Sequence, residues 1–259
     1  MSRKESHSTK NSQPQTEAME VHHHKVEKKK FKEYFLEFLM LFLAVTLGFF
    51  AENIREHSIE HKRMRQYAGL LVADLERDTA WFNNEKGQWE QRQPNFDTLI
   101  SLLVQPVSAP DDRILKNLFH INYVSNAKLN TATYNQMRAS GSLRYVNDLD
   151  LMTALEDYYE IRIPRALESS QSTLAFFDSY IKTFFIDHLR NQDMHPDDIS
   201  KRWNPVVIGR TRELDQRLSN IIDMDRTQLG IANRFYDSAN KKADELITLI
   251  KEEYHLKND

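Results

Sequence analysis

The longest apolar stretch of the chain lies near its N-terminus, at Tyr34–Ile54 (YFLEFLMLFLAVTLGFFAENI). At about 1.5 Å per residue, a helix of this length crosses the roughly 30 Å hydrocarbon core of a bilayer. Its central part, Phe38–Ala51, is interrupted only by Thr46 and Gly48. A buried helix of a soluble domain usually keeps one polar face, which this stretch lacks. The pattern therefore predicts a single membrane-spanning helix, at residues 31–54.

Two other kinds of segment contain apolar stretches of this length. A signal peptide is excluded, because the charged segment before the run is about thirty residues long and bulky Phe49 stands where cleavage after Ala51 needs a small residue. The core helix of a soluble domain stays an alternative, because the uninterrupted apolar part is short for a span. Glu37 lies about one turn inside the boundary. Its carboxylate either reaches water and the nearby lysines or contacts a second helix within the bilayer.

Residues 1–30 are rich in Ser, Gln, Lys, Glu and His and hold almost no large apolar residue. Such a segment buries too little apolar surface to offset its ordering entropy, so we expect a disordered basic tail. The lysines between Lys25 and Lys32 suit anionic lipid headgroups, and they slightly outnumber the basic residues beyond the span. We expect a cytoplasmic N-terminus and a periplasmic C-terminal domain, at a bacterial inner membrane.

The pattern changes after the apolar stretch to apolar residues spaced three and four apart, which is typical of a helix with one buried face. The first such helix is predicted to continue from the membrane span as one rod and to end at Pro94. Its inward positions are Met64, Tyr67, Leu71, Leu75 and Phe82.

Shorter helices are predicted in the middle of the chain, at Phe96–Gln105, Asp111–Asn122 and Ala132–Ser140. Gly141 closes the third of them in a left-handed conformation. Asn147 or Asp148 then caps a helix that kinks or breaks near Ile163, because Pro164 follows. The helical pattern resumes over Arg165–Arg190, with Leu174, Phe177, Ile181, Phe184 and Phe185 directed inward.

The last third of the chain is predicted to hold a loop at Asn191–Gly209, with Trp203 packed on the bundle, and a long helix that begins at Thr211. Apolar residues in this helix alternate spacings of three and four, as in a coiled-coil seam. The seam fits either one helix of an antiparallel bundle or an intermolecular coiled coil. No stretch shows convincing strand alternation, so the sequence predicts an all-α fold in which residues 55–259 form an antiparallel helical bundle. The seam residues are Leu229, Ala232, Tyr236, Ala239, Ala243, Leu246 and Ile250.

Several short motifs occur in a recognisable order. Glu37 and Gly48 lie in the span and are followed by Asn53 and Arg55, and the later pairs are Thr133-Tyr134, Ser140-Gly141, Leu143-Arg144 and Tyr158-Tyr159. The chain resembles, over roughly Phe31–Tyr159, a large family of uncharacterised single-pass bacterial membrane proteins with an N-terminal anchor and a Thr-Tyr…Ser-Gly segment. The resemblance implies the same architecture and no particular activity.

Composition excludes several classes of function. The chain has no cysteine, which rules out disulfides, iron–sulfur clusters and thiol catalysis. Its formal net charge of −3 offers no basic field to nucleic acid, so we expect no nucleic-acid partner. Glycine loops of the nucleotide-binding kind do not occur, and we expect no cofactor.

One motif has a catalytic spacing, His57-Ser58-Ile59-Glu60-His61, which matches the H-x-x-E-H pattern of inverted zinc metalloproteases. On a helix, His57 and His61 share one face, which is the arrangement that such proteases use to bind zinc, and Glu60 has the position of their general base. The motif lies in a strongly charged, solvated run, and zinc needs a third ligand that the sequence does not identify.

The segment Thr131–Arg144 is the best candidate for a specific contact with a partner. It places Tyr134, Arg138, Gly141 and Arg144 on a short capped helix and its turn. Tyrosine and arginine are common anchors of protein interfaces. In the alternative, Tyr134 and Met137 fill the core and the arginines are solvated.

These patterns favour a non-enzymatic, membrane-anchored scaffold or interaction module. We expect its partner to be the lipid bilayer together with a second copy of the chain or another membrane or periplasmic protein. The first alternative is a ligand-sensing extracytoplasmic domain in which a small molecule binds between helices. It is less favoured because the cytoplasmic side carries only the tail. The second alternative is a zinc peptidase that uses His57, Glu60 and His61.

Overall fold

The structure is a computed structural model, and it describes residues 30–105, 110–191 and 205–256. The chain divides into two compact units, Met1–Arg55 and Glu56–Asp259. The predicted basic tail and Trp203 lie outside the described residues. Helix α1 (Phe31–Val104) has residues in both units.

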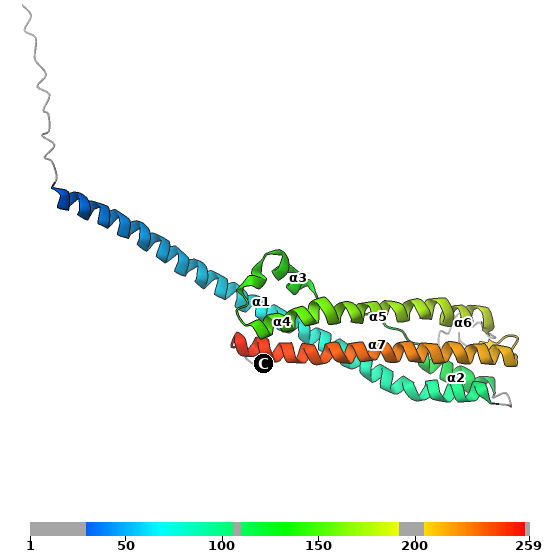
Figure 1. The fold of residues 1–259 in the computed structure, drawn as a ribbon. Helices are drawn as coiled ribbons and strands as arrows, with labels where there is room; N and C mark the ends of the chain where they lie inside the picture. Colours follow the sequence, from blue (N-terminus) through cyan, green and yellow to red (C-terminus); the bar gives the residue numbers. More distant parts are fainter. Residues whose placement is uncertain (1–29, 106–109, 192–204, 257–259) are drawn as a thin grey trace, which may run out of the picture. The chain divides into compact units, whose positions relative to one another are not determined.

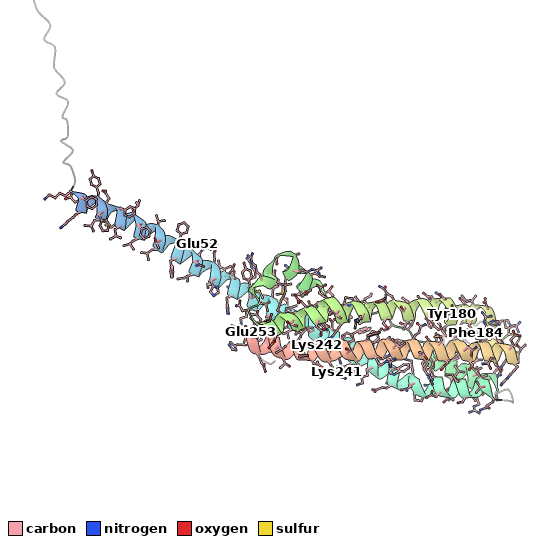
Figure 2. The ribbon with its side chains drawn as sticks, in the orientation of Figure 1. Glu52, Tyr180, Phe184, Lys241, Lys242 and Glu253 are labelled. Carbon is pink, nitrogen blue, oxygen red and sulfur yellow. The ribbon has the colours of Figure 1, made fainter. Side chains whose placement is uncertain are left out.

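The apolar stretch forms the part of α1 that belongs to the first unit. Every described side chain of this part is exposed, and side chains project from it on all sides (Figure 2). Its most apolar 18-residue window has a mean hydropathy of 2.0 and contains no buried residue. The Thr46 hydroxyl donates a 2.8 Å hydrogen bond to the Phe42 carbonyl oxygen, so its polar group is satisfied within the helix. By length and composition, this helix is able to cross a membrane.

The second unit is a bundle built on three long helical stretches that run side by side (Figure 1). The first is α1 from Glu56 onward. The second consists of α4 (Leu149–Glu156), η2 (Asp157–Arg162), α5 (Ile163–Phe176), η3 (Phe177–Ile181) and α6 (Lys182–His188), and the third is α7 (Arg212–Glu253). Short elements flank the three stretches, namely α2 (Asp111–Ile121), α3 (Ala132–Ala139) and the 3₁₀ turn η1 (Ser142–Tyr145). The prediction of an all-α fold is confirmed.

Pro94 does not end the first helix, because α1 continues to Val104. The prediction of a separate helix at Phe96–Gln105 is therefore wrong as well. Proline removes one backbone donor, but Phe96 and Leu99, which follow it, are fully buried (0% exposed). Burying two such side chains contributes roughly 3–6 kcal/mol, which outweighs a cost of about 3 kcal/mol for an internal proline.

Pro164 does not break its helix, because a wide turn precedes it. The turn η2 is π-helical, and the backbone N–H of Ile163 donates to the carbonyl oxygen of Tyr158, five residues earlier. A second π-helical turn, η3, follows α5, where the N–H of Lys182 donates to the carbonyl oxygen of Phe177. π-Helical turns are rare and recur at functional sites. In η2 the extra residue per turn places both Tyr158 and Tyr159 inside the bundle.

Two short strands replace the end of the helix that was predicted to run to Arg190. Strands β1 (Leu189–Asn191) and β2 (Pro205–Val207) pair antiparallel, with Leu189 opposite Val207. The prediction was wrong here because two three-residue strands are too short to show alternation. Their pairing depends on residues far apart in sequence.

Helix α7 begins as the sequence predicts. The Thr211 hydroxyl accepts a 3.1 Å hydrogen bond from the backbone N–H of Leu214, and Glu213 and Asp215 lie in the first turn. All seven residues of its apolar seam are buried within the bundle.

The interior of the bundle consists of two apolar clusters. One surrounds Leu75, Phe82, Leu155 and Leu246, and the other surrounds Phe96, Leu99, Leu118 and Ile222. Helices α1 and α7 contribute to both clusters, so they connect the two halves of the core.

Candidate functional site

A buried polar cluster lies beside the first apolar cluster, with Asp78 of α1 at its centre. Asp78 is fully buried (0% exposed) and accepts three hydrogen bonds. The backbone and side-chain N–H groups of Asn130 donate to its Oδ1 over 2.9 and 2.7 Å, and the Tyr158 hydroxyl donates to its Oδ2 over 2.8 Å. Burial raises the pKa of Asp78, while these hydrogen bonds act in the opposite direction.

Asp74, one helical turn before Asp78, binds the start of α3. Its Oδ2 accepts a 2.5 Å hydrogen bond from the Thr133 hydroxyl, and its Oδ1 pairs with Arg77. Two carboxylates on one face of α1 therefore hold Asn130 and Thr133. This explains why Thr133 of the Thr-Tyr motif is buried, although its hydroxyl is polar.

Three tyrosines complete the cluster. The rings of Tyr134 and Tyr159 stack with their centroids 4.3 Å apart, and Tyr158 meets Tyr159 edge-on at 4.8 Å. Burial raises the pKa of all three hydroxyls, and the carboxylate of Asp78 adds to this for Tyr158 and Tyr159. The Tyr159 hydroxyl is buried and has no hydrogen-bond partner among the described residues. With its carboxylates occupied by protein donors and its phenols protonated, the cluster fixes α3 against α1.

Tyr134 is therefore a core residue, because only 3% of it is exposed. The prediction that it anchors a partner is wrong. Arg138 and Arg144 are exposed, as the alternative interpretation expected: Arg138 Nη1 lies 2.8 Å from Glu160 Oε1, and the Arg144 guanidinium lies 4.6 Å from the centre of the Tyr145 ring. Gly141 has a φ of 69° and closes α3 in the predicted left-handed conformation. Glu37 is exposed and belongs to the first unit.

The H-x-x-E-H motif lines a pocket of about 230 Å³ in the second unit. Glu253 and Tyr254, from the end of the bundle's last helix, share this pocket with His57, Glu60 and His61. In the part of the chain that the structure describes, no three His, Cys, Asp or Glu side chains are arranged to hold a metal ion. The geometry therefore gives the zinc-peptidase alternative no support.

A second buried group of charges lies between α1 and α7, at Arg92 and Asp225. Both are about 95% buried. Arg92 donates to the carbonyl oxygens of Gln88 and Tyr123 over 2.9 and 2.7 Å. Burial raises the pKa of Asp225 to about 7, and the positive charge of Arg92 counteracts part of this shift. The interior of the bundle thus holds a carboxyl group that titrates near neutral pH.

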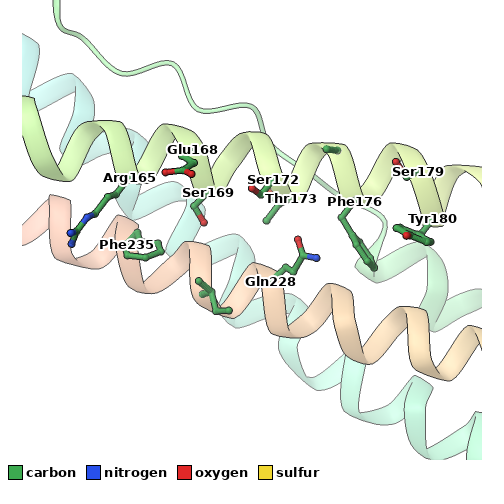
Figure 3. A pocket seen from close by; sticks show the side chains of 12 residues that line it. Arg165, Glu168, Ser169, Ser172, Thr173, Phe176, Ser179, Tyr180, Gln228 and Phe235 are labelled. Atoms are coloured by element: carbon green, nitrogen blue, oxygen red, sulfur yellow. The ribbon is translucent and has the colours of Figure 1, made fainter.

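A groove of about 850 Å³ lies between α5 and α7 (Figure 3). Small side chains, such as Ser169, Ser172 and Thr173, form the centre of the α5 side, and the larger Arg165 and Phe176 lie at its two ends. Ile231 and Phe235 line the α7 side, and both remain more than one-third exposed (37% and 36%). Two exposed apolar side chains beside a wall of small ones form a surface on which another molecule can pack. We call this surface the α5–α7 groove.

The sequence analysis did not identify the α5–α7 groove as a site. Ile231 and Phe235 lie one residue before the buried seam residues Ala232 and Tyr236. Their spacing of four was therefore attributed to the predicted core helix and not to a separate surface. A signal existed, because an apolar pair next to a complete seam makes that helix apolar on two adjacent faces.

The described fold and sites define an all-α protein with one apolar N-terminal helix, a helical bundle and an open groove on that bundle. Comparison with protein-family models, curated proteins and solved structures finds no match. The resemblance to single-pass bacterial membrane proteins therefore stays a prediction.

Proposed function

We propose that the chain is a single-pass membrane protein whose helical bundle is a non-enzymatic interaction module. The α5–α7 groove is the observation that carries this proposal. Partially exposed Ile231 and Phe235 beside small side chains are typical of a surface that another helix covers. The exposed apolar part of α1 supports the membrane assignment, because lipid tails solvate such a surface and water does not.

In this proposal the N-terminus is cytoplasmic and the bundle lies in the periplasm of a bacterium. The basic residues before Phe31 support this orientation. A protease added outside intact spheroplasts tests it. The bundle should be digested, whereas an epitope placed at the N-terminus should be cut only after the membrane is opened.

Photo-cross-linking in native membranes tests the interaction itself. A photoreactive amino acid at Phe235, in the groove, should give a cross-linked product of defined mass. The same group at Lys116, on an exposed face of α2, serves as the matched control and should give none. A full-length protein that a carbonate wash removes from membranes would refute the anchor. Membranes that retain the protein but yield no product at Phe235 would refute the interaction module.

A second candidate function is a ligand sensor, and the size of the α5–α7 groove favours it. A volume of about 850 Å³ falls within the range of roughly 300–1,000 Å³ that small-molecule sites occupy. A compound that raises the unfolding temperature of the wild-type chain, but not of the Ser172→Trp variant, would establish this function. A compound screen that finds no such stabiliser counts against it.

A further inference from the structure

The two walls of the α5–α7 groove run antiparallel, and one contact fixes their relative height. Nη1 of Arg162, directly before α5, donates a 3.2 Å hydrogen bond to the carbonyl oxygen of Ser238 on α7. Arg165 and Phe235, each three residues further into the groove, line the same pocket (Figure 3). One residue forward along α5 therefore corresponds to one residue back along α7, and each such step changes the height along the helices by about 1.5 Å.

Both walls carry the spacing of helices that pack against other helices. On α5 and η3, the groove residues Ser169, Ser172, Phe176 and Ser179 lie three, four and three residues apart. On α7, Gln228, Ile231 and Phe235 lie three and four residues apart. This alternation is the spacing of knobs-into-holes packing. The groove thus has one seam on each wall, and both seams face outward.

The two walls are complementary in size. The α5 wall carries the small residues Ser169, Ser172 and Thr173 over its central part, between Arg165 at one end and Phe176 at the other. On the α7 wall, Ile231 lies level with Ser169 and Phe235 lies level with Arg165. A surface with bulky residues on one half and small residues on the other fits a copy of itself that has been turned by half a revolution.

We infer that the partner of the α5–α7 groove is a second copy of this chain, related by a twofold axis that runs along the two helices. This inference rests on the proposed interaction module and names its partner. Rotation about such an axis preserves height, so α7 of each copy faces α5 of the other. Ile231 of one copy then packs against Ser169 of its partner copy, and Phe235 packs against the aliphatic stem of the partner's Arg165. Both bundles point the same way, as two chains anchored in one bilayer require.

Charges on the outer edges of the two walls fit the same arrangement. Glu168 lies on the outer edge of α5, and Arg234 lies on the outer edge of α7; both are exposed. Neither side chain has an ion pair within residues 30–105, 110–191 and 205–256, the ranges that the structure describes. Counting from Arg162 and Ser238, their heights differ by two residues, or about 3 Å. In the symmetric dimer each Glu168 therefore meets Arg234 of the other copy, and the pair forms twice.

The absence of natural cysteine gives a direct test of this contact. Two full-length chains with different tags, one Glu168→Cys and the other Arg234→Cys, are produced together in the same membranes and treated with a short bismaleimide. We expect a product that carries both tags. Each variant alone should give much less, because two copies of the same position lie on opposite edges of the dimer. Glu168→Cys combined with Asn84→Cys, on α1, is the matched control and should give none.

Charge reversal tests the same contact without a linker. Glu168→Arg alone and Arg234→Glu alone each place like charges together twice per dimer, so each should weaken self-association about fivefold in mild detergent. A mixture of the two variants should restore it, because both contacts then join Arg to Glu. Circular dichroism of each variant should match that of wild type, since both side chains are exposed.

The outcomes separate this inference from the proposed function. A two-tag product together with restored association in the mixture supports the dimer. A mixture that associates as weakly as the single variants, with no two-tag product, overturns it. If the photoreactive group at Phe235 then captures a different protein, the interaction module stands and only the second copy is wrong. If it captures nothing, both fail.

Discussion

The Tyr158 hydroxyl donates a 2.8 Å hydrogen bond to Oδ2 of Asp78, although the two residues lie eighty positions apart in the chain. Both residues are fully buried. A carboxylate in such a place is stable only when donors surround it, and Tyr158 supplies one of the three. The bond therefore links η2 to α1 through a group that solvent does not reach.

Replacement of Tyr158 by Phe should destabilise the bundle by about 1–3 kcal/mol, because it leaves an oxygen of Asp78 buried without its donor. Chemical denaturation of the full-length chain in detergent micelles, followed by circular dichroism, measures this loss. A variant as stable as wild type would mean that water replaces the hydroxyl and that the cluster does not hold η2 in place.

Tyr159→Phe is the matched change at the next residue, and the opposite result is expected there. The Tyr159 hydroxyl is buried without a partner among the described residues, so its removal takes away an unsatisfied polar group. The free energy of unfolding should stay the same or rise by up to about 1 kcal/mol. A loss as large as that of Tyr158→Phe would show that a buried water binds this hydroxyl.

The turn after α3 gives a prediction about backbone conformation. Gly141 has a φ of 69°, so Gly141→Ala should cost about 1 kcal/mol even though its added methyl group would meet no atom within 4 Å. Gly69 lies inside α1, where an added methyl group also meets nothing. Gly69→Ala should therefore raise stability by roughly 0.5–1 kcal/mol. Thermal unfolding of both variants checks the two signs, and equal signs would contradict the left-handed turn.

Local patterns predicted much of this fold correctly. The cap at Asp148, one of the two residues proposed for it, the start of a helix at Thr211, the turn at Gly141 and the buried seam of α7 all follow from residues close in sequence. Proline was the main source of error. Its local effect was judged correctly, but tertiary burial of Phe96 and Leu99 and the π-helical turn before Pro164 decided the outcome.

The sites were harder to predict because they join distant residues. The sequence analysis did not single out Asp74 and Asp78, since their donors Thr133, Asn130 and Tyr158 lie 52 to 80 residues away. The groove depends on how α5 and α7 are aligned, which periodicity within one helix does not specify. Even so, the pair Ile231 and Phe235 was visible in the sequence as an apolar face without an assigned partner.

The stability of the bundle should depend on pH through Asp225. Its pKa is raised from 3.8 to about 7 by burial, despite the opposing charge of Arg92. Between these values the folded chain binds a proton at this position that the unfolded chain has released. The contribution of Asp225 to stability therefore falls as pH rises from about 4 to about 7, and it stays low above that.

Asp225→Asn removes this titration while keeping a side chain of similar size. At pH 4 the variant should be about as stable as wild type, and at pH 8 it should be more stable by roughly 2–4 kcal/mol. Denaturation curves of the full-length chain at both pH values measure this difference. Asp223→Asn, on the solvent side of the same helix, is the control and should show no such gain at pH 8. An equal change in stability for Asp225→Asn at pH 4 and pH 8 would mean that the carboxyl group stays in one protonation state throughout, and an equal loss at both would identify Arg92 as its permanent counter-ion.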